Sequence, residues 1–223
     1  MQNQYRFLKH EDTLASLRTS MASHSGVSPG RIPQQERGQQ RVFALLNAAS
    51  QLLAEKGYEA ATMSEVAERA QAAIGSIYQF FPNKQSLACA LNTGCGEDIE
   101  KLWAPVLSES SSLDLEQGLT RLIEITVRYI DTHPVVLALQ QTPKSTWNQS
   151  VKLRLELQIA TFLIRNNPKL TNGDATLHAS ICMRIIKSCS EHFLEVEKRK
   201  RKRIVAEYKT LLGCYAESRL KAN

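Results

Sequence analysis

Apolar residues recur at helical spacing along most of the chain. The first long run, 37–56, has steps of three and four residues between its apolar positions, which are Val42, Leu45, Leu46, Ala49, Leu52 and Leu53. Such a stripe is typical of one face of a helix. Further helix-period runs cover 114–132, 135–139, 147–165, 174–198 and 204–220. Because β-type alternation persists nowhere, the pattern predicts an all-α protein.

The pattern breaks into short pieces after residue 56. Gly57 follows the last periodic residue of the first run, where a helix-stopping residue with positive φ is expected. Thr62 precedes Glu65 by three residues, and this capping box predicts the start of a second helix. The second helix is short, because the apolar period is interrupted again at 71–73.

A third short helix is predicted after this interruption, with Ile77 and Phe81 on its apolar side. Pro82 ends it, because proline disfavours helical geometry in the residue before it. Asn83 can cap a fourth helix that runs through Leu91 and beyond. Two short helices joined by a tight turn form a helix-turn-helix, which places its second helix in the major groove of DNA.

The stretch from about 38 to 98 resembles the DNA-binding domain of the TetR family of one-component bacterial repressors. The resemblance is carried by Gly57, Tyr58, Thr62, Val66, Ala67, Ala70, Gly75, Ser76, Ile77, Tyr78, Phe81, Asn83, Lys84 and Leu87. Elsewhere the chain is similar to the family only in being helical and of suitable length. The implied organisation is a three-helix DNA-binding domain at 37–98 and a helical ligand-binding and dimerisation domain at 99–223. The polar composition of residues 1–36 predicts a flexible N-terminal tail before them.

The chain departs from the family pattern at the turn. Family members usually carry Gly, an apolar residue and Ser or Thr there, whereas this chain has Gln71, Ala72 and Ala73. Gln71 must then adopt a conformation that Gly takes freely. Ala73 leaves the third helix without a side-chain cap, at a cost of about 1 kcal/mol. Ile74 stands where the family often has a basic or polar residue, so an apolar contact to a thymine methyl is available to it.

The outward side of the third helix supplies the candidate base contacts, which are Ile74, Gly75, Ser76, Tyr78 and Gln79. We expect Ser76 and Gln79 to be exposed, since glutamine can bond adenine with two hydrogen bonds and serine can serve base or phosphate. Tyr78 is expected to reach DNA, the alternative being that its ring packs against the first helix. The other candidate DNA contacts are Arg41, Thr62, Ser64 and Lys84, and for Lys84 a solvated lysine is the alternative.

Composition adds little to this interpretation. The chain is 43 % hydrophobic and 22 % charged, as in ordinary globular proteins. The net charge of +6 does not mark the DNA site, because 37–103 has six basic and seven acidic residues, whereas 104–223 has eighteen and twelve. The lack of a long apolar run or signal pattern and the five cysteines predict a cytoplasmic protein without a membrane partner. The family resemblance implies that it is bacterial and nucleoid-associated.

Two seams in the last helices predict an oligomer. One is Cys182, Ile186, Cys189 and Phe193, and the other is Tyr208, Leu211 and Tyr215. Their steps of three and four fit a four-helix bundle made by two copies of the chain. The alternative is that a seam packs into the core of its own chain. The resemblance implies a homodimer, which would present two reading helices to a palindromic operator in double-stranded DNA.

The remaining candidates concern ligands. Lys198–Arg203 is a run of six cations, which is either a second nucleic-acid contact, a surface for an acidic partner, or a solvated link between the last two helices. Candidate residues for a small-molecule effector pocket are Trp103, Tyr129, Trp147, Phe162 and Met183, each of which can also be ordinary core.

No arrangement of nucleophile, base or metal ligands stands out, so we expect neither an enzyme nor a cofactor or metal site. The helix-turn-helix predicts sequence-specific DNA binding, and the family resemblance implies a ligand-responsive transcriptional repressor. The alternative is a helical interaction protein that retains the fold without binding DNA.

Overall fold

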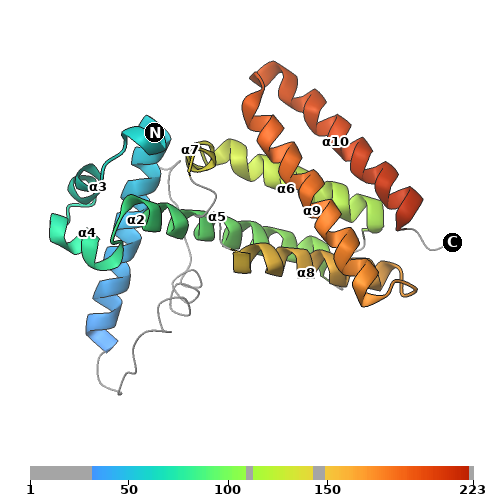
Figure 1. Ribbon diagram of the computed structural model, residues 1–223, viewed down its shortest axis with the longest axis horizontal. Coiled ribbons are helices and arrows are strands. Elements are labelled where there is room, and N and C mark those ends of the chain that lie inside the picture. The colour runs from blue at the N-terminus through green and yellow to red at the C-terminus, as the bar shows by residue number, and fades with distance from the viewer. Residues whose placement is uncertain (1–31, 109–112, 143–148, 221–223) are drawn as a thin grey trace. The chain divides into compact units, whose positions relative to one another are not determined.

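The computed structural model describes residues 32–108, 113–142 and 149–220 (Figure 1). Within these ranges every regular element is a helix and no strand occurs, which confirms the all-α prediction. None of the helices in this part of the chain is long and apolar enough to cross a membrane. The predicted tail up to residue 31 and the pocket candidate Trp147 lie outside the described residues.

The chain forms two compact units, and each is described by itself. Unit 1 comprises the described residues of Met1–Cys95 and His133–Trp147, and unit 2 comprises those of Gly96–Thr132 and Asn148–Asn223. This division differs from the expected one, which has its boundary after residue 98 and 133–147 in the C-terminal domain. The short apolar helix in that segment, α7 (Val135–Gln140), instead packs against the first long helix of unit 1, because Val135, Ala138 and Leu139 form a buried face.

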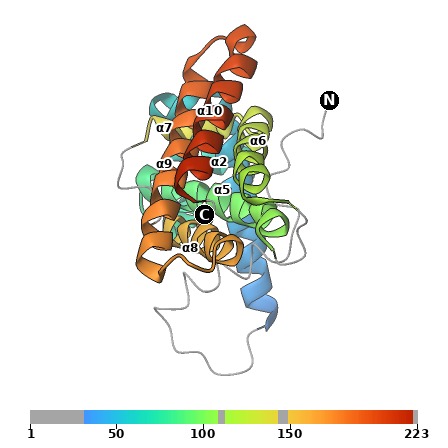
Figure 2. The same cartoon turned by 90° about the vertical axis from the view of Figure 1, so that its right-hand side faces the viewer.

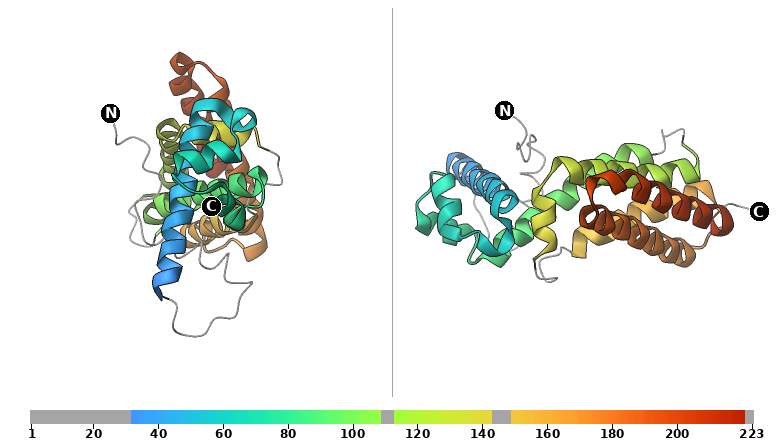
Figure 3. Two further views of the ribbon diagram at one scale, coloured as in Figure 1. Left: turned by 90° about the vertical axis from the view of Figure 1, so that its left-hand side faces the viewer. Right: turned by 90° about the horizontal axis from the view of Figure 1, so that it is seen from above.

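Unit 1 is built on α2 (Ile32–Ala60), against which α3 (Met63–Arg69) packs, and α4 (Ile74–Phe80) packs on α3 (Figure 3, left). The helix α2 begins at Ile32, five residues before the predicted start at 37. Gly57 has φ 79°, as its sequence position predicted, but helical geometry resumes beyond it and continues to Ala60. A side chain at this kink would also approach α7, since a Cβ would lie 3.4 Å from Oε1 of Gln141.

Unit 2 contains the second half of α5 (Lys84–Leu107) together with α6 (Leu115–Thr132), α8 (Gln149–Asn166), α9 (Asn172–Glu195) and α10 (Lys198–Arg219). The helix α9 packs against α6, α8 and α10, and Figure 2 shows α9 and α10 side by side. The helices α6 and α8 approach closely at Gly118, where a Cβ would lie only 2.3 Å from the ring of Phe162.

The seam on α9 is part of this core. Cys182, Ile186, Cys189 and Phe193 are all buried within their own chain, which corrects their assignment to the dimer interface. The sequence pattern could not distinguish the two cases, since steps of three and four residues fit any helix that packs on another. Burial also raises the pKa of Cys182 to about 12 and that of Cys189 to about 11, so both thiols stay protonated near neutral pH.

The basic run is not a link between two helices. Lys198–Arg203 forms the first turns of α10, where positive charge is disfavoured by the helix dipole. Two of its cations are paired: Arg199 with Glu197, and Arg201 with Asp131 at 2.8 Å. The Arg201 guanidinium also stacks 4.5 Å from the centre of the Phe193 ring.

The predicted pocket residues in the described part of unit 2 are largely core. Trp103 is buried and donates from Nε1 to Oγ1 of Thr126 at 3.2 Å, and Phe162 is fully buried. Tyr129 is buried and donates its hydroxyl to Asp98 at 3.0 Å, whereas Met183 is half-buried. A polar groove of about 540 Å³ lies elsewhere, between α6 and α10, and is lined by Glu116, Thr120, Glu124, Lys202, Val205, Ala206, Lys209 and Thr210.

Candidate nucleic-acid interface

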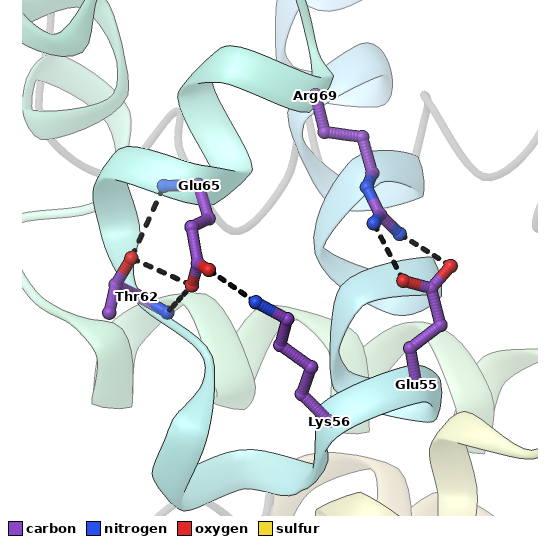
Figure 4. Close-up of polar contacts among 5 residues, drawn as sticks. All are labelled: Glu55, Lys56, Thr62, Glu65 and Arg69. Carbon is purple, nitrogen blue, oxygen red and sulfur yellow. Dashed lines mark hydrogen bonds and ion pairs between the residues drawn. The ribbon is translucent and has the colours of Figure 1, made fainter.

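The helix α3 is fixed at both ends by polar contacts (Figure 4). The Thr62 hydroxyl accepts from the backbone N–H of Glu65 at 3.2 Å, and the Glu65 carboxylate accepts from the backbone N–H of Thr62 at 3.1 Å. This is the capping box that the sequence predicted. Glu65 also pairs with Lys56 of α2, and Arg69 binds Glu55 of α2 with two hydrogen bonds at 2.6 and 2.7 Å.

These contacts change the ionisation of the carboxylates involved. The hydrogen bond from Lys56 is the largest cause that lowers the pKa of Glu65, and the hydrogen bonds from Thr62 add to it. The hydrogen bond from Arg69 lowers the pKa of Glu55 in the same way. Both carboxylates are therefore charged at neutral pH, and α3 is held to α2 by two ion pairs.

The turn between α3 and α4 has the geometry expected from its unusual sequence. Gln71 has φ 52°, the left-handed conformation that glycine adopts without strain. Ala73 is the N-cap residue of α4 and makes no side-chain capping hydrogen bond. The helix α4 therefore begins without a side-chain cap, in contrast to α3.

The helix α4 has a buried and an exposed side. Ile77 is fully buried and anchors the helix to the core of unit 1. Ile74 and Tyr78, one turn apart, are 47 % and 49 % exposed, and Gly75 and Gln79 are also exposed. The ring of Tyr78 is thus half open to solvent, where it is available to a ligand.

Ser76 does not belong to this exposed surface. Its side chain is only 7 % exposed, and its Oγ accepts a hydrogen bond from Nη1 of Arg41 at 3.3 Å. The prediction that Ser76 is an exposed reader of bases is therefore wrong. Ser76 lies beside Ile77 on the buried side of α4, and its hydrogen bond with Arg41 ties α4 to α2. Arg41 itself remains exposed.

The candidate phosphate contacts are arranged in different ways. Lys84 donates to the backbone carbonyls of Tyr58 and Glu59 at 2.9 and 3.0 Å, and its ammonium lies 4.6 Å from the centre of the Tyr58 ring. It thereby joins the start of α5 to the end of α2, a role that sequence reasoning missed, and its phosphate contact stays a prediction. The Thr62 hydroxyl is used in the capping box, and Ser64 is exposed on α3.

The start of α5 is capped as predicted. The side-chain oxygen of Asn83 accepts from the backbone N–H of Ser86 at 2.8 Å, and the Ser86 hydroxyl donates back to the carbonyl of Asn83 at 2.7 Å. The helix α4 ends at Phe80, two residues before Pro82.

With its paired short helices and exposed second helix, unit 1 has the form of a helix-turn-helix transcriptional regulator.

Comparison with known proteins supports this class. Residues 45–91 match the family described as "Bacterial regulatory proteins, tetR family". Residues 114–215 match the family described as "Tetracyclin repressor-like, C-terminal domain". The chain therefore belongs to the TetR family of bacterial regulatory proteins.

Individual relatives match only part of the chain. The TetC protein of transposon Tn10 from Escherichia coli is 29 % identical over 128 residues, which are 55 % of this chain and 62 % of TetC. The transcriptional repressor KstR of Mycolicibacterium smegmatis is 37 % identical over 84 residues, 38 % of each chain. The chain thus matches less than two thirds of the length of either relative.

Solved structures show the same fold. A TetR-family transcriptional regulator from Streptomyces coelicolor has a TM-score of 0.69 and 23 % identity, covering 82 % of this chain and 99 % of its own. A regulator of the same family from Pectobacterium atrosepticum has a TM-score of 0.69 and 14 % identity, covering 84 % and 97 %. At this level of identity the likeness concerns the fold alone.

Proposed function

We propose that the chain is a ligand-responsive repressor that binds a palindromic operator as a homodimer. The observation that carries the proposal is the exposed face of α4, on which Ile74, Gly75, Tyr78 and Gln79 are open to solvent. A helix of a helix-turn-helix that enters the major groove needs such a face. Arg41 lies beside it through its hydrogen bond to Ser76, and its exposed guanidinium suits a phosphate contact.

The effector part of the proposal rests on unit 2. Residues 114–215 match the C-terminal domain of tetracycline-repressor-like proteins. A small molecule bound by these helices would favour the conformation of the dimer that fits the operator less well. Couplings of this kind amount to about 1–3 kcal/mol, and they require the ligand to bind the two conformations with different affinity.

The test for DNA binding is the substitution Gly75→Ala. A Cβ at Gly75 would have no heavy atom within 4 Å, so the fold accommodates it, and replacing a helical glycine by alanine favours the helix by up to about 1 kcal/mol. On the operator the added methyl separates the helix from the groove. We expect an equal or higher melting temperature and an operator affinity lower by about tenfold or more in gel retardation.

The matched control is Gly173→Ala in α9, where a Cβ would lie 3.8 Å from Oγ1 of Thr171, an ordinary contact. This variant should bind the operator like the parent chain. The operator itself is found by selection from random duplexes. A parent chain that enriches no sequence would exclude the repressor and favour the helical interaction protein, and Gly75→Ala with full affinity would remove α4 from the DNA interface.

We place the dimer interface on the outer side of α9 and α10. Tyr215 and Tyr208 of α10 bond to His178 and Ser188 of α9 at 2.6 and 2.9 Å. Leu211 is one turn from each tyrosine, so it lies alongside the α9 segment between the two bonded residues. Its side chain is 53 % exposed. That segment contains half-exposed Ile181, and Leu177 just before it is 57 % exposed.

The interface is tested by Leu211→Asp, which puts a charge at the centre of this surface. We expect a monomer of unchanged helicity in sedimentation and light scattering, with the loss of operator binding that follows from losing the second reading helix. The control is Leu153→Asp in α8, where the leucine is 62 % exposed. If Leu153→Asp gives the monomer and Leu211→Asp the dimer, the interface lies on α8.

A further inference from the structure

The start of α4 carries an aliphatic side chain that its own chain does not explain. Ile74 is the first residue of the helix and is 47 % exposed, whereas the buried side of α4 is formed by Ser76 and Ile77. The residue does not serve to cap the helix either, because Ala73 is the N-cap residue and isoleucine has only moderate helix propensity. Its exposed side chain is therefore available for a contact outside the fold.

The chemistry of isoleucine restricts what it can recognise. An aliphatic side chain cannot donate to a phosphate or to the acceptor atoms of guanine. Among the base edges in the major groove, the C5-methyl group of thymine is the apolar one. We propose that Ile74 is a specificity-determining residue that packs against a thymine methyl in each half of the operator. This inference rests on the proposed function, since it assigns the chemistry read by the same exposed face.

The local geometry favours such a contact. Side chains on a helix lean toward its N-terminus, so Ile74 projects ahead of the first turn of α4, which is the end that contacts bases in this class of protein. The next residue, Gly75, has no side chain and open space around its Cβ position, which lets the backbone approach the groove. A short side chain such as isoleucine reaches a base edge only if the backbone is that close.

The neighbouring exposed residues extend the contact. Tyr78 lies one turn further along the same face and is 49 % exposed, so its ring adds apolar surface beside Ile74. Gln79 is exposed next to it and can bond an adenine. Together they predict a half-site with A·T pairs at the positions that face the start of α4.

The experiment removes the methyl group and the side chain separately. An operator is selected with the parent chain, and each thymine is replaced in turn, in both half-sites, by deoxyuridine, which lacks only the C5-methyl. Burial of one methyl changes affinity about fourfold, so two symmetric methyls change it about fifteenfold. We expect one symmetric position at which deoxyuridine weakens the parent chain by about this factor and leaves Ile74→Ala unchanged.

A second duplex supplies the methyl on another base. When cytosine replaces thymine at that position, 5-methylcytosine should restore part of the affinity of the parent chain and none of that of Ile74→Ala. Tyr78→Phe is the control variant, since it keeps Ile74 and should retain the full deoxyuridine effect. Because Ile74 is half exposed, its alanine variant should melt at the temperature of the parent chain.

Two results would overturn the inference while the proposed function stands: a selected operator on which no thymine methyl couples to Ile74, or an Ile74→Ala variant that binds every duplex as the parent chain does. If the parent chain selects no duplex at all, the proposed function fails and the inference with it. The outcome of the selection therefore separates the two failures before any deoxyuridine is tested.

Discussion

The helices α3 and α4 are each seven residues long, yet they are held in different ways. The helix α3 has a complete capping box and two ion pairs to α2, from Glu65 and Arg69. The helix α4 has an N-cap residue without a capping side chain and no acidic residue in its first turn, and it follows the left-handed Gln71. Helices this short are unstable alone, so each needs external support.

The difference shows where the support of the reading helix lies. The helix α4 depends on the burial of Ile77 and on the hydrogen bond from Arg41 to Ser76. Both contacts are on the side of α4 that faces the rest of unit 1. The exposed side of α4 contributes little to this support, so its side chains are available for the proposed DNA contacts. Local sequence rules are commonly broken at functional sites for this reason, with compensation from the surrounding structure.

The largest expected effect follows from removing the core anchor of α4. Ile77→Ala deletes a fully buried side chain and should lower the free energy of unfolding by about 2–5 kcal/mol. Ile74→Ala on the exposed side of the same helix should change it by less than about 0.5 kcal/mol. Urea unfolding followed by circular dichroism measures both. Equal effects of the two substitutions would mean that α4 is not anchored through Ile77.

A smaller effect is expected from the cap of α3. Thr62→Ala removes the side-chain oxygen that accepts from the backbone of Glu65, at a cost of about 1 kcal/mol. Urea unfolding followed by circular dichroism measures this cost. The free energy of operator binding should change less than the free energy of unfolding, because the exposed face of α4 is unchanged. A cost near zero would show that the ion pairs of α3 suffice without the cap.

The converse substitution in α4 completes the comparison. Ala73→Ser introduces the capping oxygen that this helix lacks, at a residue whose backbone is already extended as a cap requires. We expect stabilisation by up to about 1 kcal/mol. Failure to stabilise would indicate that the left-handed turn at Gln71 prevents the serine from reaching the backbone N–H groups of the first turn.

Sequence reasoning was reliable where the signal is local. The positive φ of Gly57 and Gln71, the capping box at Thr62 and the cap at Asn83 are each determined by a few neighbouring residues, and the structure confirms them. The uncapped start of α4 at Ala73 follows from the sequence in the same way.

It was unreliable where the partner lies far along the chain. The bond from Arg41 to Ser76 spans 35 residues and that from Lys84 to Tyr58 spans 26. Nothing in the sequence around Ser76 distinguishes a serine that faces α2 from one that faces solvent. The prediction that the α9 seam around Cys182 forms the dimer interface was wrong for a related reason. A helical period does not show whether the helix that covers it belongs to the same chain or to another.

The smallest effect concerns the ion pairs of α3 and appears in acid. Lys56 and Arg69 lower the pKa values of Glu65 and Glu55 from the ordinary value of 4.5, so the folded state holds these carboxylates charged more strongly than the unfolded state does. Their contribution to stability is present above the unfolded pKa and is lost as the pH falls through the lower folded pKa.

Glu65→Gln should therefore be less stable than the parent chain at pH 7 and equally stable below the folded pKa, as measured by urea midpoints from pH 7 to pH 3. Glu68→Gln removes an exposed carboxylate of α3 outside both ion pairs and corrects for the change in net charge. A Glu65→Gln curve that runs parallel to that of the parent chain at every pH would mean that the contact with Lys56 contributes no pH-dependent stability, and that the cap and the Arg69–Glu55 pair distinguish α3 from α4.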